Sequence, residues 1–184
     1  MFHYLLPWDM IVSVWMQEMQ RPWLIKRMLI ITYMGSPLTF IILTALISTY
    51  LLGVKGGRLE AIFLNASLFS TWAVMEYLKY WFGRSRPAGE ALTAASGYSF
   101  PSGHSMLAMV FYGFLAYLLI SHAKNKLEWY GVAVLCLMIL LIGFSRVYLN
   151  VHYASDVLAG FLFGFICLAV NIKGLKVTQQ RLRS

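Results

Sequence analysis

Three short polar motifs interrupt a chain that is otherwise strongly apolar. The first is KYWFGRSRP at residues 79–87, the second is PSGH at 101–104, and the third is SRVYLNVHYASD at 145–156. Together they hold cations, two histidines and a carboxylate, which are residue types suited to binding a phosphate and transferring a phosphoryl group. Each motif lies at or beside the end of an apolar run, so all three are expected to meet at one face of a membrane.

The cations Lys79, Arg86 and Arg146 come from separate parts of the chain. Their mutual repulsion at one membrane face is tolerable only if an anion sits among them. Phosphate fits, because guanidinium groups bind its oxygens in pairs and a lysine adds a point charge. The PSGH turn begins an apolar helix, where backbone N–H groups and the helix dipole favour an anion. Ser102 and Gly103 therefore join the predicted phosphate site.

The two histidines His104 and His152 can supply the nucleophile and the proton donor that phosphoryl transfer needs. Asp156 lies four residues after His152 and can hold one ring nitrogen as N–H, which leaves the other free to attack. We therefore predict His152 as the nucleophile, Asp156 as its orienting partner and His104 as the general acid.

Each feature taken alone also has a simpler interpretation. Lys79 and Arg86 are typical of side chains that snorkel at the end of a span, and Arg146 is typical of an interfacial anchor. Ser102 is equally typical of a helix N-cap. The histidine and aspartate of the third motif can form no more than a local hydrogen bond.

Other polar residues are predicted to lie outside the chemistry. Arg84 either contacts a headgroup or faces solvent, Glu76 pairs with the lysine three residues later, and Glu90 is a solvated loop carboxylate. His3 and His122 are predicted surface residues. No HExxH pattern or Cys/His cluster indicates a metal, and no cofactor is predicted.

The elements that must position these residues are helices in a membrane. The 184 residues are 60% hydrophobic and 12% charged, which indicates an integral membrane protein rather than a soluble domain. We predict an all-α polytopic transmembrane bundle in one domain, 1–184, with its core at 25–173. Five apolar runs can each cross a bilayer, at about 29–52, 61–78, 106–120, 130–144 and 157–172.

Small residues predict how these helices pack. The GSP sequence at residues 35–37 predicts a kink in the first span. Gly160 and Gly164 predict a close helix contact in the fifth. Cys136 and Cys167 fall inside spans and are predicted to be buried apolar residues.

The N-terminal segment, residues 1–24, lacks the basic start and cleavage site of a signal peptide, and its acidic residues argue against a span. As a helix it separates two faces: Trp8, Val12, Trp15 and Met19 on one, and Asp9, Ser13, Gln17 and Gln20 on the other. This predicts an amphipathic interfacial helix. An ordinary helix packed against the bundle is the alternative.

Five spans place the two ends of the protein on opposite sides of the membrane. The side away from the motifs carries Lys55, Arg58, Lys124, Lys126, Lys173, Lys176, Arg181 and Arg183. The positive-inside rule then puts that side and the basic tail, 174–184, in the cytoplasm. The active site is expected on the periplasmic or extracellular face of the cell membrane. The net charge of +8 requires no nucleic acid to explain it.

The three motifs resemble the signature motifs of the type-2 phosphatidic acid phosphatase superfamily, complete and in the family's order. The matching residues are Lys79, Arg86 and Pro87, then Pro101–His104, then Ser145, Arg146, His152 and Asp156. The resemblance implies a metal-independent membrane phosphatase that works through a phosphohistidine. By that likeness His152 is the nucleophile, Asp156 its partner and His104 the acid. Members usually have six spans, so the N-terminal segment is either interfacial or a sixth span.

The function predicted from the residues and the resemblance is hydrolysis of a lipid phosphate. The resemblance allows phosphatidylglycerophosphate, phosphatidate, undecaprenyl pyrophosphate or a lipid A phosphate as substrate, and the small size fits bacterial forms of the enzyme. A phosphotransferase with the same phosphohistidine chemistry and a non-catalytic lipid-headgroup binder are the alternatives. The expected partners are the lipid substrate and membrane lipids, with no obligatory protein partner.

Overall fold

The structure is a computed structural model that describes residues 6–54, 56–122 and 126–182. This part of the chain forms seven helices joined by loops and contains no strand, which confirms the all-α prediction. The helices are α1 (Pro7–Glu18), α2 (Pro22–Tyr33), α3 (Pro37–Gly53), α4 (Gly57–Phe82), α5 (Gly103–His122), α6 (Lys126–Tyr148) and α7 (Ala154–Arg181). His3, Lys55, Lys124 and Arg183 lie outside the described residues.

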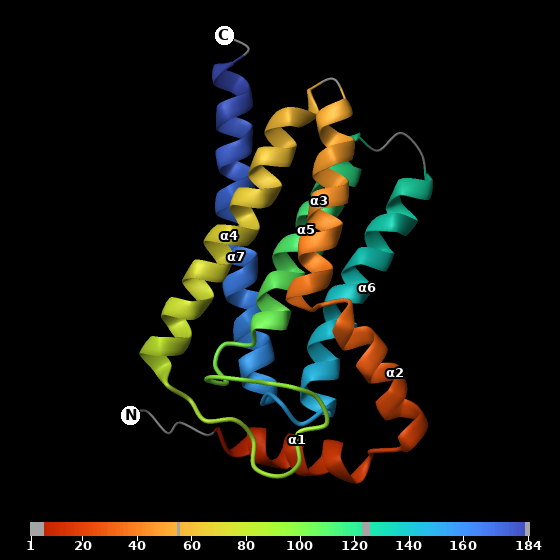
Figure 1. The fold of residues 1–184 in the computed structure, drawn as a ribbon, viewed down its shortest axis with the longest axis vertical. Coiled ribbons are helices and arrows are strands. Elements are labelled where there is room, and N and C mark those ends of the chain that lie inside the picture. Colours follow the sequence, from red (N-terminus) through yellow and green to blue (C-terminus); the bar gives the residue numbers. More distant parts are fainter. Residues whose placement is uncertain (1–5, 55, 123–125, 183–184) are drawn as a thin grey trace.

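Helix α5 lies in the middle of the bundle and packs against α4, α6 and α7 (Figure 1). Its contact with α7 depends on two glycines. A Cβ atom added at Gly160 would lie 2.7 Å from the carbonyl oxygen of Ser102, and one at Gly164 would lie 2.7 Å from that of Met106. The predicted close contact is confirmed, and it brings the first turns of α5 and α7 together.

The GSP sequence at residues 35–37 ends one helix and begins the next. The hydroxyl of Ser36 caps α3 by accepting a hydrogen bond from the backbone N–H of Thr39 at 3.2 Å. Helices α2 and α3 meet at an angle of 46°, so the predicted kink is confirmed as a complete break. A Cβ atom at Gly35 would lie 3.3 Å from Cδ2 of His104, which means that the break also adjoins the second motif.

Three helices, α5, α6 and α7, are each long and apolar enough to cross a membrane, and the bent pair of α2 and α3 can form a fourth span. The remaining predicted span, at about 61–78, corresponds to α4, which has 26 residues and packs against α3 and α5 (Figure 1). Polar side chains such as Asn65 and Thr71 make α4 less apolar. By length and composition, the described helices therefore support three to four of the five expected spans.

Helix α1 lies across one end of the bundle and contacts α6 and α7 (Figure 1). Trp8, Trp15 and Met19 are exposed, whereas Asp9 and Ser13 on the opposite face are buried. The predicted division into two faces is confirmed only in part, because Val12 packs against the bundle, Gln17 is exposed, and α1 ends at Glu18, before Met19 and Gln20. The buried part of the polar face packs against protein. The outward apolar face is the kind of surface that a helix at a lipid boundary presents.

The two ends of the bundle differ as predicted: α1 and the loops carrying the motifs lie at one end, and the C-terminal end of α7 lies at the other (Figure 1). Because α7 continues to Arg181, most of the predicted tail at 174–184 is helical. Cys167 is partly buried, but Cys136 is exposed, so its predicted burial is wrong. Outer helices bury only one face, and Cys136 lies on the outward face of α6.

Candidate active site

The three motifs converge on one cavity of about 270 Å³. The end of α4, the start of α5 and the end of α6 each contribute to its wall, together with the loop that leads into α7. The predicted site residues that line it are Lys79, Arg86, Gly103, His104, Arg146 and His152. Ser102 and Asp156 are fully buried behind this wall. Residues separated by more than 70 positions in the sequence are thus brought around one space.

Two glycines allow the first and second motifs to meet. Gly83 has a φ of 58°, and its N–H closes the last turn of α4 by bonding to the carbonyl of Lys79 at 3.0 Å. A Cβ atom at Gly103 would lie 2.5 Å from the sulfur of Met75 and 3.7 Å from Nζ of Lys79. A side chain at this position would force Met75 to shift, so glycine favours the close approach of the start of α5 to α4.

Ser102 acts as the cap of α5 in this structure. Its hydroxyl accepts hydrogen bonds from the hydroxyl of Ser105 at 3.0 Å and from the backbone N–H of Ser105 at 3.5 Å. Its own N–H donates to the carbonyl of Asp156 at 3.0 Å. The free amides at the start of α5 are therefore those that follow it, from Gly103 and His104, because first-turn N–H groups have no partner within a helix.

His152 is buried and is held on both ring nitrogens. Nδ1 lies 3.4 Å from Oδ2 of Asp156 and 3.3 Å from the hydroxyl of Ser99. Nε2 lies 3.3 Å from a guanidinium nitrogen of Arg86. A guanidinium only donates, so Nε2 is the acceptor, and the proton of the neutral ring is assigned to Nδ1. The lone pair therefore belongs to the nitrogen on the Arg86 side.

Burial lowers the pKa of His152 from 6.5 to about 4. The positive charges of Arg146 and Arg86 contribute to this lowering, while the hydrogen bond and charge of Asp156 oppose it. Burial also lowers the pKa of Arg86. His152 is thus neutral at pH 7, which is the form a nucleophilic imidazole requires.

Asp156 has both carboxylate oxygens occupied. Oδ1 accepts a hydrogen bond from Arg84 at 2.6 Å, and Oδ2 accepts one from the hydroxyl of Ser99 at 2.5 Å and one from the N–H of Tyr153 at 2.9 Å. Ser99 was not predicted as part of the site. It precedes the PSGH motif in a loop rich in small residues, and no spacing in the sequence distinguishes it.

Arg146 is 3% exposed, which excludes the interfacial-anchor interpretation. One terminal nitrogen donates to the hydroxyl of Thr32 on α2 at 2.7 Å, and Nε has no partner within the described structure. Thr32, which the sequence did not predict as part of the site, therefore orients the Arg146 side chain. A buried guanidinium with an unused donor is well suited to an anion.

Arg86 connects the loop before α5 to the segment that carries His152. Its guanidinium donates to the carbonyls of Ser96 at 2.6 Å, Gly97 at 3.1 Å and Val151 at 2.7 Å. This network fixes the loop over the cavity. An anion bound beside Arg86 would share the guanidinium with these carbonyls.

The expectation that Arg84 contacts a headgroup or solvent is wrong. Arg84 is 7% exposed, and it lies between Asp9 of α1 and Asp156 of α7, with nitrogen–oxygen distances of 2.7 and 2.6 Å. Glu76 lines the cavity beside Lys79. Glu90 is exposed, as predicted.

The fold and the site together define a class: a helical membrane protein whose apolar bundle ends in a cationic, histidine-containing cavity. Three basic side chains, the start of a helix and two imidazoles can hold a tetrahedral oxyanion and exchange protons with it. No group of three or more His, Cys, Asp or Glu side chains in the described ranges is placed to hold a metal ion.

The chain belongs to the PAP2 superfamily, whose family model matches residues 60–177. It is 34% identical over 169 residues to phosphatidylglycerophosphatase B of Bacillus subtilis (strain 168), a match that covers 89% of this chain and 81% of the relative. It is a membrane protein of a lipid phosphatase family.

Two solved structures share the fold. The crystal structure of a transmembrane PAP2-type phosphatidylglycerolphosphate phosphatase from Bacillus subtilis matches with a TM-score of 0.85 and 30% identity, over 92% of this chain and 85% of the other. LpxE of Aquifex aeolicus matches with a TM-score of 0.72 and 25% identity, over 89% of this chain and 94% of the other.

Proposed function

We propose that the protein hydrolyses the phosphate of a membrane lipid through a phosphohistidine, without a metal ion. The observation that carries this proposal is the shared cavity: two imidazoles lie in one wall with the cationic side chains of Lys79, Arg86 and Arg146. Such a set can neutralise a phosphate and also supply a nucleophile and an acid.

In the proposed first step, Nε2 of His152 forms a bond to phosphorus while the bond from phosphorus to the lipid oxygen breaks. His104 donates a proton to that oxygen. In the second step, water attacks phosphorus, His104 accepts its proton, and the bond to Nε2 breaks to release inorganic phosphate. Asp156 holds the Nδ1–H of His152 throughout. Lys79, Arg86, Arg146 and the first amides of α5, beginning at Gly103, hold the phosphate oxygens.

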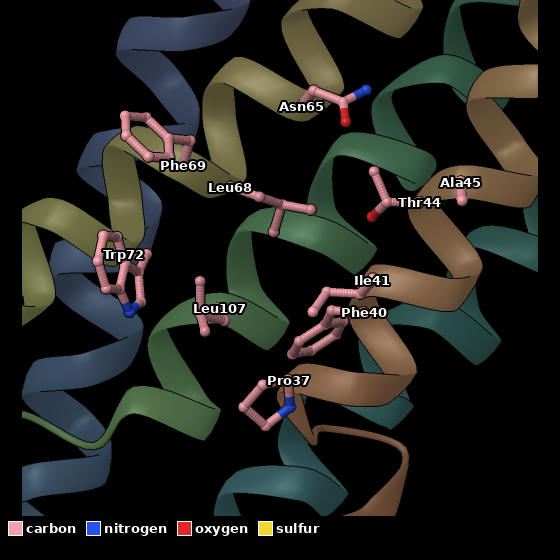
Figure 2. Close-up of a pocket in the computed structure, with 10 residues that line it drawn as sticks. All are labelled: Pro37, Phe40, Ile41, Thr44, Ala45, Asn65, Leu68, Phe69, Trp72 and Leu107. Atoms are coloured by element: carbon pink, nitrogen blue, oxygen red, sulfur yellow. The ribbon is translucent and has the colours of Figure 1, made fainter.

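A lipid substrate is supported by an apolar groove next to the cavity. The groove has a volume of about 560 Å³ and lies between α3 and α4, with Leu107 of α5 at its base (Figure 2). Pro37, Trp72 and Leu107 line both the groove and the cavity. A phosphate in the cavity could therefore remain attached to an acyl or prenyl chain in the groove.

The orientation in the membrane is also a proposal. The basic residues Arg58, Lys126 and Arg181 lie at or near helix ends remote from the cavity, which supports a cytoplasmic location for that end and for the C-terminus. The cavity would then open toward the periplasm or the cell exterior. A cysteine placed at Glu90 should react with an impermeant reagent added outside intact cells, and labelling only after lysis would reverse this orientation.

The deciding experiment measures phosphate released by purified protein in detergent from phosphatidylglycerophosphate, phosphatidate, undecaprenyl pyrophosphate and a lipid A phosphate. At least one should yield phosphate at the same rate with and without EDTA. Transfer of the phosphoryl group to an added alcohol without free phosphate would instead identify a phosphotransferase. Binding without turnover of any substrate would identify a headgroup binder.

A further inference from the structure

A buried cluster of charges lies on the side of His152 that faces away from the cavity. Asp9 comes from α1, Arg84 from the segment after α4, and Asp156 from the first turn of α7. The two aspartates have no exposed surface. Burying charges is unfavourable unless each is paired and hydrogen-bonded, so the contacts within this cluster must be close and specific.

The guanidinium of Arg84 forms an ion pair with each of the two carboxylates. One terminal nitrogen lies 2.7 Å from Oδ2 of Asp9, and the other lies 2.6 Å from Oδ1 of Asp156. The second nitrogen also donates to the hydroxyl of Ser155 at 2.7 Å, and the ring of Tyr153 lies 4.5 Å from the guanidinium carbon. A planar group held at both ends cannot rotate. The position of Asp156 therefore depends on α1 as well as on α7.

Asp9 also binds the first turn of α7 directly. Its Oδ1 accepts a hydrogen bond from the backbone N–H of Ser155 at 2.9 Å, and its Oδ2 accepts one from the hydroxyl of Ser155 at 2.5 Å. A carboxylate at a helix N-terminus satisfies amides that have no partner within the helix, and it interacts favourably with the helix dipole. Asp9 thus fixes the turn that carries Asp156 in two independent ways.

The charge of this cluster is opposite to that of the cavity. One arginine shared by two aspartates leaves one net negative charge, whereas Asp156 paired with Arg84 alone would be neutral. When Nε2 of His152 bonds to phosphorus, positive charge develops on the imidazole. The cations Arg86 and Arg146 on the cavity side cannot stabilise that charge, so a negative group on the Nδ1 side is required.

We propose that Asp9 is a positioning residue for the reaction: acting through Arg84 and Ser155, it aligns Asp156 with His152 and keeps the cluster negative. The proposal rests on the proposed roles of His152 and Asp156. It makes the N-terminal helix a part of the catalytic apparatus. Asp9 touches neither substrate nor the reacting atoms.

The test compares two changes, one on α1 and one in the segment that follows it, in the full chain, assayed with the most active lipid phosphate of the panel. Asp9→Asn removes one charge from the cluster with little change of shape. Gln20→Ala is the matched control, because Gln20, which lies between α1 and α2, anchors this part of the chain by donating to the carbonyl of Tyr148 at 3.1 Å, away from the cluster. Melting temperature, kcat, KM and inhibition by inorganic phosphate are measured for each.

Asp9→Asn should lower kcat by about 10- to 100-fold, the usual range for an outer residue that orients a reacting one. KM and the inhibition constant for phosphate should stay within about twofold, because the cations of the cavity are unchanged. Gln20→Ala should keep kcat within about twofold of the wild type. Arg84→Lys should reproduce the pattern of Asp9→Asn, since an ammonium group cannot hold both carboxylates in one plane, and it tests the proposal even if Asp9→Asn does not fold.

Wild-type kcat in Asp9→Asn, or in Arg84→Lys where only that variant folds, would overturn the proposal. Equal losses in Asp9→Asn and Gln20→Ala that follow a fall in melting temperature would also overturn it, because α1 would then be only structural. His152→Ala separates this inference from the proposed function. If that variant keeps its activity, the proposed reaction fails; if it is inactive while Asp9→Asn has normal kcat, only the role of Asp9 fails.

Discussion

The two sides of His152 have opposite chemical characters. On the cavity side, Lys79, Arg86 and Arg146 are all positive, and Nε of Arg146 has no partner within the described structure. On the buried side, Asp9 and Asp156 share one arginine, and every carboxylate oxygen accepts at least one hydrogen bond. Nε of Arg84 on the buried side also has no partner within the described structure, so the two sides differ in their charge and in their satisfied carboxylates, and not in unused donors.

The two sides of the His152 imidazole therefore have different proposed roles. In the proposed reaction, the cavity side would bind the phosphate and repel positive charge on the ring, and the buried side would compensate for that repulsion. A change on the cavity side should therefore alter affinity for phosphate, while a change on the buried side should alter the rate of bond formation.

The largest effect is expected from the two histidines. His152→Ala should lower kcat by about 10⁴-fold or more, because it removes the nucleophile of the proposed reaction. His104→Ala should lower it by about 10²–10⁴-fold and leave a phosphoenzyme that forms and decays slowly, because the proton donor aids the step without forming the bond. Acid quenching after mixing with radiolabelled substrate measures the phosphoenzyme. Turnover at the wild-type rate in His152→Ala would contradict the assignment.

The next effect concerns how the cavity holds phosphate. Arg146→Gln should weaken inhibition by inorganic phosphate by about 10- to 100-fold, since a charged hydrogen bond contributes about 1.5–3 kcal/mol. Thr32→Val removes only the hydrogen bond that orients Arg146. It should therefore weaken inhibition by inorganic phosphate by only about two- to fivefold. Unchanged phosphate inhibition in Arg146→Gln would remove this residue from the binding site.

The cavity side could be predicted from the sequence, whereas on the buried side only Asp156 could. Lys79, His104 and His152 stand out because charged and imidazole groups are rare in an apolar chain and occur in short motifs. Asp9 lies 75 residues before Arg84, on a helix whose polar face is also typical of a helix facing water. Periodicity shows which residues share a face, but it does not show whether that face meets water, lipid or protein.

The fold, too, could be predicted from the sequence only in part. Long apolar runs predicted the helices, and glycine or proline predicted the break before α3 and the contact between α5 and α7. The span count was less predictable, because α4 mixes polar and apolar residues along its length. Thr32 and Ser99 were missed, since a hydroxyl in a helix or loop acquires its role only from the residue that packs against it.

A moderate effect is expected from pH. Because burial lowers the pKa of His152 to about 4, neutral imidazole persists in mildly acidic solution, and kcat/KM should fall only below about pH 5. Asp156→Asn should move this acid limb to lower pH, because the carboxylate raises the pKa that burial and the charges of Arg146 and Arg86 lower. A soluble phosphate ester, corrected for its own ionisation, provides the profile. An acid limb near pH 6.5 in the wild type would contradict the buried, neutral state of His152.

The smallest effect concerns the outer face of α1. Its polar face binds the buried cluster, while Trp8 and Trp15 are 38% and 54% exposed on the opposite face at the catalytic end (Figure 1). Tryptophan at such a place prefers the boundary between headgroups and acyl chains, which a lipid substrate must cross sideways to reach the cavity. A soluble phosphate ester arrives from water and does not cross this boundary. The apolar face of α1 should therefore matter for one substrate and not for the other.

Replacing Trp8 and Trp15 by serine should lower kcat/KM for a long-chain lipid phosphate about two- to fivefold more than for a soluble analogue. Trp129→Ser is the control, because this tryptophan is also exposed, at 57%, but lies near the start of α6, at the other end of the bundle. Comparing the two substrates at equal amounts of folded protein cancels any loss of stability, since unfolding lowers both rates by the same factor. If the ratio stays unchanged, the outer face of α1 has no part in substrate entry, and the helix acts on the reaction only through Asp9. If Trp129→Ser changes the ratio as much, the effect comes from the lipid around the protein and not from the catalytic end.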